Sequence, residues 1–242
     1  MSANQMVLNN PDAYQTGSEI ELMEQLLPIR DTRILELGCG SAWITRRLAE
    51  SHPDCHFIAT EVDRIQHQKN LAEPVANVNF RLEGAQSISE PDQSVDIVWM
   101  LKSLHHIPEE TMPKVMSEIV RVLKPGGMAY FSEPVYSGKF NALMSLIHDE
   151  KEVRESAFRA IQSLLERGSM TLLGQFFLNV PGCYESWEAF ESRFLNVTHT
   201  RLQIDKVRYQ QIKQAFMAHM GAQGAEFLKP HRVDLLHKSN IS

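Results

Sequence analysis

The chain has 242 residues, of which 43% are hydrophobic and 22% are charged, and its formal net charge at pH 7 is −6. This length and composition indicate an ordinary globular protein built as one large domain, and they argue against two independent domains. The acidic balance provides no basic field over the whole surface, so a large nucleic acid partner is disfavoured.

Cysteine usage and hydropathy narrow the class of protein further. The three cysteines, Cys39, Cys55 and Cys183, are an odd number at spacings that match no zinc or disulfide framework. We therefore expect free thiols in a reducing compartment. No apolar run approaches the length of a membrane span, and the segment Met1–Gln5 lacks the basic start of a signal peptide. These features predict a cytoplasmic protein that does not span a membrane.

The N-terminal segment predicts a helix preceded by a lone aromatic residue. A capping box formed by Ser18 and Glu21 begins the helix 18–27, and Pro28 ends it. Tyr14 comes before this helix, and it either folds over a ligand as part of a lid or is an ordered surface aromatic.

The stretch Arg33–Ile44 contains the strongest local signal in the chain. Its first residues form an apolar run, typical of a strand covered on both faces, and a turn with Gly38 and Gly40 follows. The residues after the turn continue as a helix. Such a turn is typical of a nucleotide site in a parallel α/β sheet, because unpaired backbone N–H groups and the positive end of the helix dipole meet there.

The residues around this turn indicate which nucleotide it suits. The dinucleotide fingerprint G-x-G-x-x-G requires a third small residue, but Trp43 or Ile44 stands at that position. Instead, Glu36 precedes Gly38 by two residues, and Cys39 lies between the glycines as a small packing residue rather than a nucleophile. This E-x-G-x-G pattern resembles the first motif of the class I S-adenosylmethionine-dependent methyltransferases.

The next predicted strand ends in a carboxylate that is placed to bind a ribose. The segment 56–61 reads as a strand, and its last residue, Glu61, stands 21 residues after the second glycine. In a βαβ unit this spacing brings an acid to the ribose hydroxyls. Asp63 is the competing residue, although it is also well placed to cap the helix 64–72. We expect Glu61 to bind the ribose and Val62 to lie against the adenine ring.

The third predicted strand, 78–82, precedes the expected adenine contact. In methyltransferases that this chain resembles, the place after this strand often reads Gly-Asp-Ala, and the acid receives the adenine amino group. Gly84 occupies the position of that acid. Either Glu83 or Gln86 is therefore expected to replace it, while the backbone N–H of Ala85 serves the ring.

The fourth predicted strand, 95–101, opens into the loop 102–106 at the carboxyl end of the sheet, where ligands gather. This loop is expected to border the transferable methyl group. His105 and His106 are either general bases or residues that pack and orient the loop. A metal site is disfavoured, because no carboxylate and third ligand share their spacing.

Four ordered landmarks agree with the methyltransferase family. They are E-L-G-C-G, the acid after the second strand, V-D-I-V, and an L-K-P-G-G turn at 123–127 between a helix over 111–123 and a strand over 128–133. Together they cover residues 34–133, so this part of the chain carries the resemblance to class I methyltransferases.

Beyond Ser137 the resemblance fades, and the acceptor is expected to be recognised there. The apolar pattern predicts one long helix or two broken helices within 139–167. The remaining predicted elements are a strand or strand pair over 170–180, helices over 187–195 and 205–220, and a final strand over 226–237 in an antiparallel hairpin.

The predicted fold is a single α/β domain of the Rossmann-like methyltransferase type. It has a doubly wound, mostly parallel, seven-stranded sheet with helices on both faces. Residues 1–28 are expected to form an N-terminal lid and helix, and a helical cap insertion after strand five, at about 137–168, is expected to close the site.

The resemblance implies methyl transfer from S-adenosylmethionine to a small-molecule acceptor in an enclosed pocket, with no metal required. The implied cofactor-binding residues are Glu36, Gly38, Cys39, Gly40, Glu61, Val62, Gly84, Ala85, Gln86, Leu101 and Lys102. The candidate acceptor-binding residues are Tyr14, Ser103, Glu133, Tyr136 and His148, and the candidate catalytic residues are His105 and His106. Three alternatives stay open: a methyltransferase acting on tRNA or protein, a non-catalytic S-adenosylmethionine-binding protein, and an NAD-dependent oxidoreductase.

Overall fold

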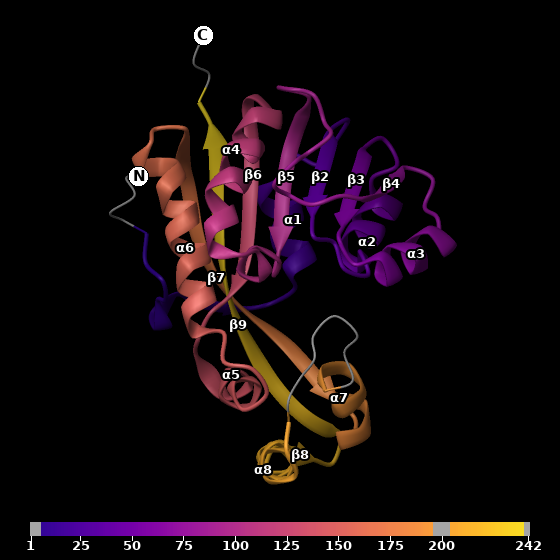
Figure 1. Cartoon of the computed structure of the whole chain (residues 1–242), viewed down its shortest axis with the longest axis vertical. Helices are drawn as coiled ribbons and strands as arrows, with labels where there is room; N and C mark the ends of the chain where they lie inside the picture. The colour runs from indigo at the N-terminus through magenta and orange to yellow at the C-terminus, as the bar shows by residue number, and fades with distance from the viewer. Residues whose placement is uncertain (1–5, 196–203, 240–242) are drawn as a thin grey trace.

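The computed structural model describes residues 6–195 and 204–239, which form one open sheet covered by helices (Figure 1). The strands lie in the order β1-β7-β9-β6-β5-β2-β3-β4, and β8 pairs with β9. Their bounds are Tyr14–Thr16 (β1), Arg33–Leu37 (β2), His56–Glu61 (β3), Val78–Leu82 (β4), Val95–Leu101 (β5), Leu123–Pro134 (β6), Met170–Tyr184 (β7), Met220–Gly221 (β8) and Gly224–Lys238 (β9).

Eight α-helices and three short 3-10 turns accompany the sheet in the described ranges. The helices are Glu19–Leu26 (α1), Trp43–Ser51 (α2), Arg64–Ala72 (α3), Met112–Val122 (α4), Gly138–Ser145 (α5), Lys151–Glu166 (α6), Trp187–Phe194 (α7) and Lys206–Met217 (α8). The 3-10 turns are Pro11–Ala13 (η2), Leu104–His106 (η3) and Glu109–Thr111 (η4). Within residues 6–195 and 204–239, no helix is both long and apolar enough to cross a bilayer.

The predicted α/β fold is confirmed, but the strand number is corrected from seven to nine. Five strand pairs are parallel and three, all involving β9, are antiparallel. The two additional strands are β1, with three residues at the sheet edge, and β8, with two. Strands this short carry no readable alternation of apolar and polar residues, so the sequence pattern missed them.

Two helical layers bury the two faces of the sheet. On β5, Val98 and Met100 contribute to a core beneath α4 and α6, whereas Ile97 and Trp99 contribute to a second core beneath α1 and α2. This division follows from the geometry of a strand, in which successive side chains point to opposite faces. All four side chains are buried, as the continuous apolar run of β5 predicts.

The long antiparallel strands β7 and β9 extend past the rest of the sheet and build a second lobe (Figure 1). We call this the lower lobe; it consists of α5, α7, α8, β8 and the adjoining ends of β7 and β9. Aromatic side chains fill its interior. They include Phe140, Tyr184, Trp187, Phe190, Phe216 and Phe227. The carboxyl ends of β2, β3 and β5 point toward this lobe.

The helical cap predicted at about 137–168 is only half right. The segment contains two helices, and α5 does belong to the lower lobe. The second, α6, instead packs Ala157, Phe158 and Ile161 into the main core beside α4. Its apolar stripe therefore covers the sheet and not the ligand site.

Three local predictions also need correction. Ser18 has the extended backbone of an N-cap, but its side chain makes no capping hydrogen bond, so the predicted capping box is absent. The L-K-P-G-G segment follows the end of α4 as predicted, but it belongs to β6, where residues 124–127 bulge out between the pairs Val95–Leu123 and Ile97–Met128. In addition, β7 continues to Tyr184, beyond the predicted end at residue 180.

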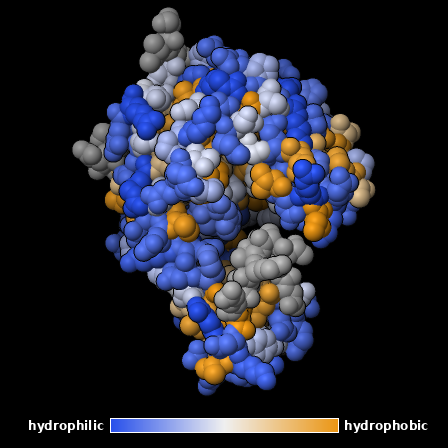
Figure 2. Space-filling model, viewed as in Figure 1, coloured by the Kyte–Doolittle hydropathy of each residue, from blue (hydrophilic) through white to orange (hydrophobic). Residues whose placement is uncertain are grey.

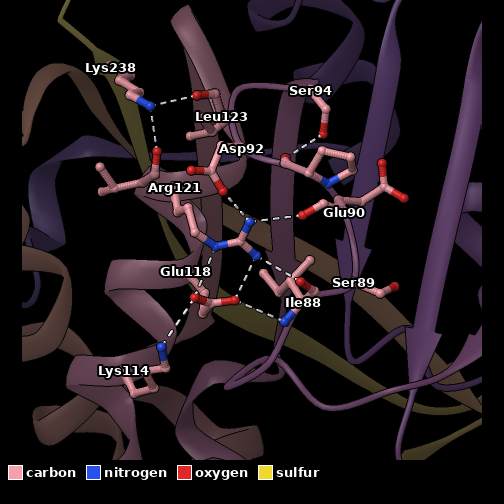
Figure 3. A network of polar contacts seen from close by, with 12 residues as sticks. Ile88, Ser89, Glu90, Asp92, Ser94, Lys114, Glu118, Arg121, Leu123 and Lys238 are labelled. Atoms are coloured by element: carbon pink, nitrogen blue, oxygen red, sulfur yellow. Dashed lines mark hydrogen bonds and ion pairs between the residues drawn. The ribbon is translucent and has the colours of Figure 1, made fainter.

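A network around Arg121 fixes the connection between β4 and β5 (Figure 3). The Arg121 guanidinium donates to the carbonyl oxygens of Ile88 and Glu90, at 2.7 and 2.9 Å, and to the carboxylate of Glu118, at 2.8 Å. The hydrogen bonds from Arg121 are the main reason why the pKa of Glu118 is lowered to about 2. The connection that carries residues 84–86 is thus tied to α4.

Replacing Arg121 with alanine is expected to destabilise the fold by about 2 kcal/mol, because the buried Glu118 loses its main charged donor. Urea unfolding measures this loss. Lys114→Ala is the matched control, since Lys114 contacts the same carboxylate from a side chain that is largely exposed, and it is expected to change stability by less than about 0.5 kcal/mol. Equal losses in the two variants would contradict the network.

Candidate functional site

The glycine turn between β2 and α2 depends on positive φ angles and on a close neighbour. Gly38 has φ +73°, and a Cβ there would lie 2.8 Å from the Cβ of Ser103. Gly40 has φ +54°, and a Cβ there would meet no atom within 4 Å. Gly38 is therefore required by packing within the protein, whereas the space above Gly40 is open to a ligand.

The acid of this motif is buried beneath the turn. Glu36 is 3% exposed, and the Thr45 hydroxyl donates to its carboxylate. Burial raises the pKa of Glu36 to about 7, although Thr45 and the nearby Lys102 partly offset this effect. At neutral pH this carboxyl group is therefore only partly ionised.

Glu61, at the end of β3, connects that strand to the glycine turn. Its carboxylate accepts hydrogen bonds from the backbone N–H groups of Gly40 at 2.8 Å, Val62 at 2.7 Å and Asp63 at 2.8 Å. A carboxylate offers about four acceptor positions, so one remains for a ligand hydroxyl. Asp63 caps α3, accepting from the backbone N–H of Ile65 at 2.8 Å, as predicted.

Cys39 is a packing residue in this turn, in agreement with the sequence. Its backbone N–H donates to the Thr60 carbonyl at 2.8 Å. Burial, reinforced by the carboxylates of Glu36 and Glu61, raises the pKa of the thiol well above its usual range. A thiol held in this form is a poor nucleophile.

The loop after β4 distinguishes the two candidates for the missing acid. Glu83 accepts from the Ser89 backbone N–H at 2.9 Å and from its hydroxyl at 2.5 Å, so this carboxylate is already engaged. The Gln86 carboxamide lies over Gly84, and a Cβ at Gly84 would be 2.5 Å from Gln86 Oε1. The geometry therefore favours Gln86. Ala85 is buried beside it.

An apolar surface lies next to this loop. Val62 is 68% exposed directly after the end of β3, and Leu82, at the end of β4, is also exposed and pairs with Glu61 in the sheet. Large apolar side chains left open at adjoining strand ends offer a platform for a flat, apolar ring.

The loop that follows β5 is fixed by long-range contacts. Lys102 has φ +58°, its N–H donates to the Ser132 carbonyl at 2.7 Å, and its ammonium group pairs with the buried Glu19 of α1. Ser103 donates its hydroxyl to the Leu37 carbonyl at 2.8 Å, so it holds the loop against β2. The buried Leu101 ends the strand.

His105 and Glu133 form a buried pair at the ends of β5 and β6. His105 Nδ1 lies 2.5 Å from Glu133 Oε2, and Glu133 Oε1 accepts from the Leu104 N–H at 3.0 Å. Burial by itself would lower the pKa of His105, but the adjacent carboxylate outweighs it and the pKa is raised. Burial would likewise raise the pKa of Glu133, and His105 reverses this, so that pKa is lowered. Each group of the pair therefore stabilises the charged form of the other.

A second carboxylate faces this pair from the turn before α6. Glu150 Oε2 lies 3.9 Å from His105 Nε2 and 2.6 Å from an Arg154 guanidinium nitrogen. His148 Nδ1 lies 3.6 Å from Glu150 Oε1, and its side chain is 60% exposed. Tyr136 lies at the carboxyl end of β6 with an exposed side chain.

Tyr14 is not brought to these strand ends. It lies in the edge strand β1, where its hydroxyl donates to Asn9 at 2.9 Å and its ring packs edge-on against Phe177. This position fits the alternative of an ordered aromatic residue at the sheet edge, and the lid role of Tyr14 stays a prediction. Its place is set by pairing with β7, an interaction that the sequence does not encode locally.

The strand ends face a hollow that separates the sheet from the lower lobe (Figure 2). A different depression of about 180 Å³ lies at the amino ends of β3 and β4, lined by His56, Asn77 and their neighbours. It is at the opposite edge of the sheet from the glycine turn, so it does not belong to this site.

Sequence reasoning missed two charged residues near these strand ends. Glu19 lies in a helix whose pattern is typical of a surface helix, and Arg154 lies in a helix expected to act as a cap. Their partners are Lys102, 83 residues from Glu19, and Asn141, 13 residues from Arg154. No local pattern could have signalled these contacts.

Comparison with known proteins agrees with this geometry. A family model described as a methyltransferase domain matches residues 34–127. The uncharacterized methyltransferase YcgJ of Bacillus subtilis (strain 168) is 24% identical over 194 residues, which are 77% of this chain and 76% of the relative. The 27-O-demethylrifamycin SV methyltransferase of Amycolatopsis mediterranei (strain S699) is 33% identical over 107 residues, but these are only 42% of this chain and 39% of that enzyme.

Solved structures share the fold at low sequence identity. The crystal structure of YcgJ from Bacillus subtilis superposes with a TM-score of 0.63 at 20% identity, covering 91% of this chain and 97% of that one. The [4+2]-cyclase SpnF gives a TM-score of 0.57 at 18% identity, covering 91% of this chain and 80% of that one. At these identities the likeness concerns the fold alone.

Proposed function

This chain belongs to the class I S-adenosylmethionine-dependent methyltransferases, and from that premise we propose that it methylates a small-molecule acceptor at the carboxyl ends of β5 and β6. The observation that supports this placement is the polar cluster of His105, Glu133 and Glu150, which joins the loop after β5 to the end of β6 and to the turn before α6.

The residues of the glycine turn fit S-adenosylmethionine as the cofactor. Open space above Gly40 leaves room for a ligand against the main chain, and Glu61 keeps an acceptor position for a ribose hydroxyl. Val62 and Leu82 provide an apolar surface for the adenine ring, and the Gln86 carboxamide lies beside it. The cofactor-binding roles of these residues, and the same role for Leu101 and Lys102, are part of the proposal.

The protein's contribution to the reaction is mainly positional. The bound cofactor supplies a methyl group on a positively charged sulfur, which is already activated toward nucleophiles. The loop 102–106 is held by hydrogen bonds to β2 and α1, so it forms a rigid side of the proposed acceptor site. The lower lobe lies opposite the strand ends and is suited to limit access of water. The catalytic role expected for His105 and His106 stays a prediction.

A small-molecule acceptor is favoured over tRNA or protein. The net charge of −6 provides no basic field for a nucleic acid. The name of the Amycolatopsis mediterranei relative refers to a small-molecule substrate, demethylrifamycin. Ser103, Glu133, Tyr136 and His148 are the proposed acceptor-side residues, and a cytoplasmic location stays a prediction.

Two measurements test this proposal. Isothermal titration with S-adenosylmethionine and with S-adenosylhomocysteine tests cofactor binding, and absence of binding to both would refute the cofactor site. Incubation of the protein with methyl-labelled cofactor and fractionated metabolites, RNA or protein tests the acceptor class. Label transfer to RNA or protein only would contradict a small-molecule acceptor.

A second candidate is a role without methyl transfer. It is favoured by one comparison, because SpnF shares this fold and is described as a [4+2]-cyclase. Such a protein would bind the cofactor as tightly as an enzyme does, yet would form no S-adenosylhomocysteine in the presence of any acceptor fraction. Detection of S-adenosylhomocysteine formation that depends on an acceptor would exclude this candidate.

The adenine contact provides a separate prediction. Gln86→Ala is expected to weaken S-adenosylhomocysteine binding by about 1 kcal/mol, roughly fivefold, because one hydrogen bond to the ring is lost. Glu83→Ala is the control and is expected to leave affinity unchanged, since Glu83 bonds Ser89. If a titration shows weaker binding for Glu83→Ala and unchanged binding for Gln86→Ala, the adenine contact belongs to Glu83.

A further inference from the structure

Two histidines and a carboxylate converge at the mouth of the sheet from segments far apart in the chain. His105 and His106 come from η3, after β5, and Glu150 comes from the turn before α6. One potential ligand atom from each residue lies within 4.8 Å of the others. Two imidazoles and one carboxylate are a common ligand set for divalent transition metals.

The ring of His105 is oriented as in a metal ligand. Glu133 holds Nδ1 at 2.5 Å, and Nε2 points toward Glu150. In protein metal sites a ligating histidine usually donates its other ring N–H to a carboxylate or a carbonyl, which fixes the tautomer and leaves the second nitrogen for the metal. Glu133 is in the position to do this.

Glu150 is oriented by a neighbour in the same way. Arg154 holds Glu150 Oε2 at 2.6 Å, and the other oxygen, Oε1, has the more distant His148 as its neighbour at 3.6 Å. Ligating carboxylates are themselves commonly hydrogen-bonded. The guanidinium therefore fixes this carboxylate with Oε2 facing His105 Nε2.

The distances are close to those that an ion would impose. Ligands about 2.1 Å from a metal at a tetrahedral angle are about 3.4 Å apart. The 3.9 Å between His105 Nε2 and Glu150 Oε2 exceeds this by about half an ångström. His106 has an exposed side chain and Glu150 a partly exposed one. Rotamer changes in these two residues can therefore bring their ligand atoms within reach of one ion, while the buried His105 stays in place.

From this arrangement we propose that His105, His106 and Glu150 bind one divalent transition-metal ion. Glu133 orients His105, and Arg154 orients Glu150. The mixed nitrogen and oxygen ligands suit Zn²⁺ or Co²⁺ better than Mg²⁺ or Ca²⁺, which prefer oxygen. The sequence argued against a metal because no carboxylate shares the spacing of the histidines, and the fold provides that carboxylate from Glu150.

The experiment uses the full chain, first treated with a chelator and then dialysed against Zn²⁺ or Co²⁺. We expect one ion per chain by elemental analysis, and visible absorption bands for Co²⁺ that differ from those of the hydrated ion. His106→Ala and Glu150→Gln are the principal variants, because neither residue is fully buried and both proteins are expected to fold. Each should weaken binding at least tenfold, as should Glu133→Gln through loss of orientation.

The matched control is His52→Ala. His52 forms a surface pair with Glu24 that lies outside the cluster, so its loss should leave the stoichiometry and the Co²⁺ spectrum unchanged. The proposal is overturned if the wild-type chain binds no ion, or if His106→Ala and Glu150→Gln bind as tightly as the wild type. S-adenosylhomocysteine titrations on the same samples report on the proposed function independently, because metal binding requires no cofactor.

Discussion

Replacing Glu61 with alanine is expected to weaken S-adenosylhomocysteine binding by about 1.5–3 kcal/mol, a loss of roughly tenfold to more than a hundredfold. The proposed ribose contact is a hydrogen bond to a charged group, which sets this scale. The variant also leaves the N–H groups of Gly40, Val62 and Asp63 without their acceptor, so the glycine turn loses its link to β3. Isothermal titration measures the affinity.

Asp63→Ala separates the two carboxylates at this strand end. It removes the cap of α3 and is expected to lower stability by about 1 kcal/mol, while cofactor affinity is retained. If instead Glu61→Ala binds normally and Asp63→Ala does not, the ribose contact belongs to Asp63. Circular dichroism during thermal unfolding distinguishes a weakened site from a destabilised protein.

The stability of the cofactor-free protein is expected to fall as pH rises from about 4.5 to about 7, because of Glu36. In this range the folded chain keeps a proton on the buried carboxyl group, while the unfolded chain has released it. A pKa that is raised from 4.5 to about 7 corresponds to about 3 kcal/mol of stability that is present below pH 4.5 and lost above pH 7.

Glu36→Gln tests this effect directly. The amide keeps the size of the side chain and can still accept from Thr45, but it cannot ionise. Its stability relative to the wild type is therefore expected to increase by up to about 3 kcal/mol between pH 4.5 and pH 8, measured by urea unfolding. Glu21→Gln, at an exposed position on α1, is the control. A constant difference between Glu36→Gln and the wild type across this range would show that Glu36 does not titrate as described.

Several features of this chain are determined by its sequence alone. The bounds of β3, α3, β4 and β5 were predicted to the residue, because each has a local pattern: apolar residues that stop at or just before a charged residue, or a capping aspartate. The glycine turn was placed for the same reason, since positive φ angles restrict the residue type at Gly38 and Gly40. These landmarks carried the resemblance to the class I methyltransferases.

The tertiary structure alone decided which side chains meet at the site. Glu133 approaches His105 across 28 residues, and Glu19 approaches Lys102 across 83. The sequence left both Glu83 and Gln86 open as replacements for the acid, and the contact of Glu83 with Ser89 and the position of Gln86 over Gly84 favoured Gln86. Local patterns record whether a residue is buried and in which backbone conformation. The partner of a polar side chain depends instead on how distant segments pack, and packing is settled by the whole core at once.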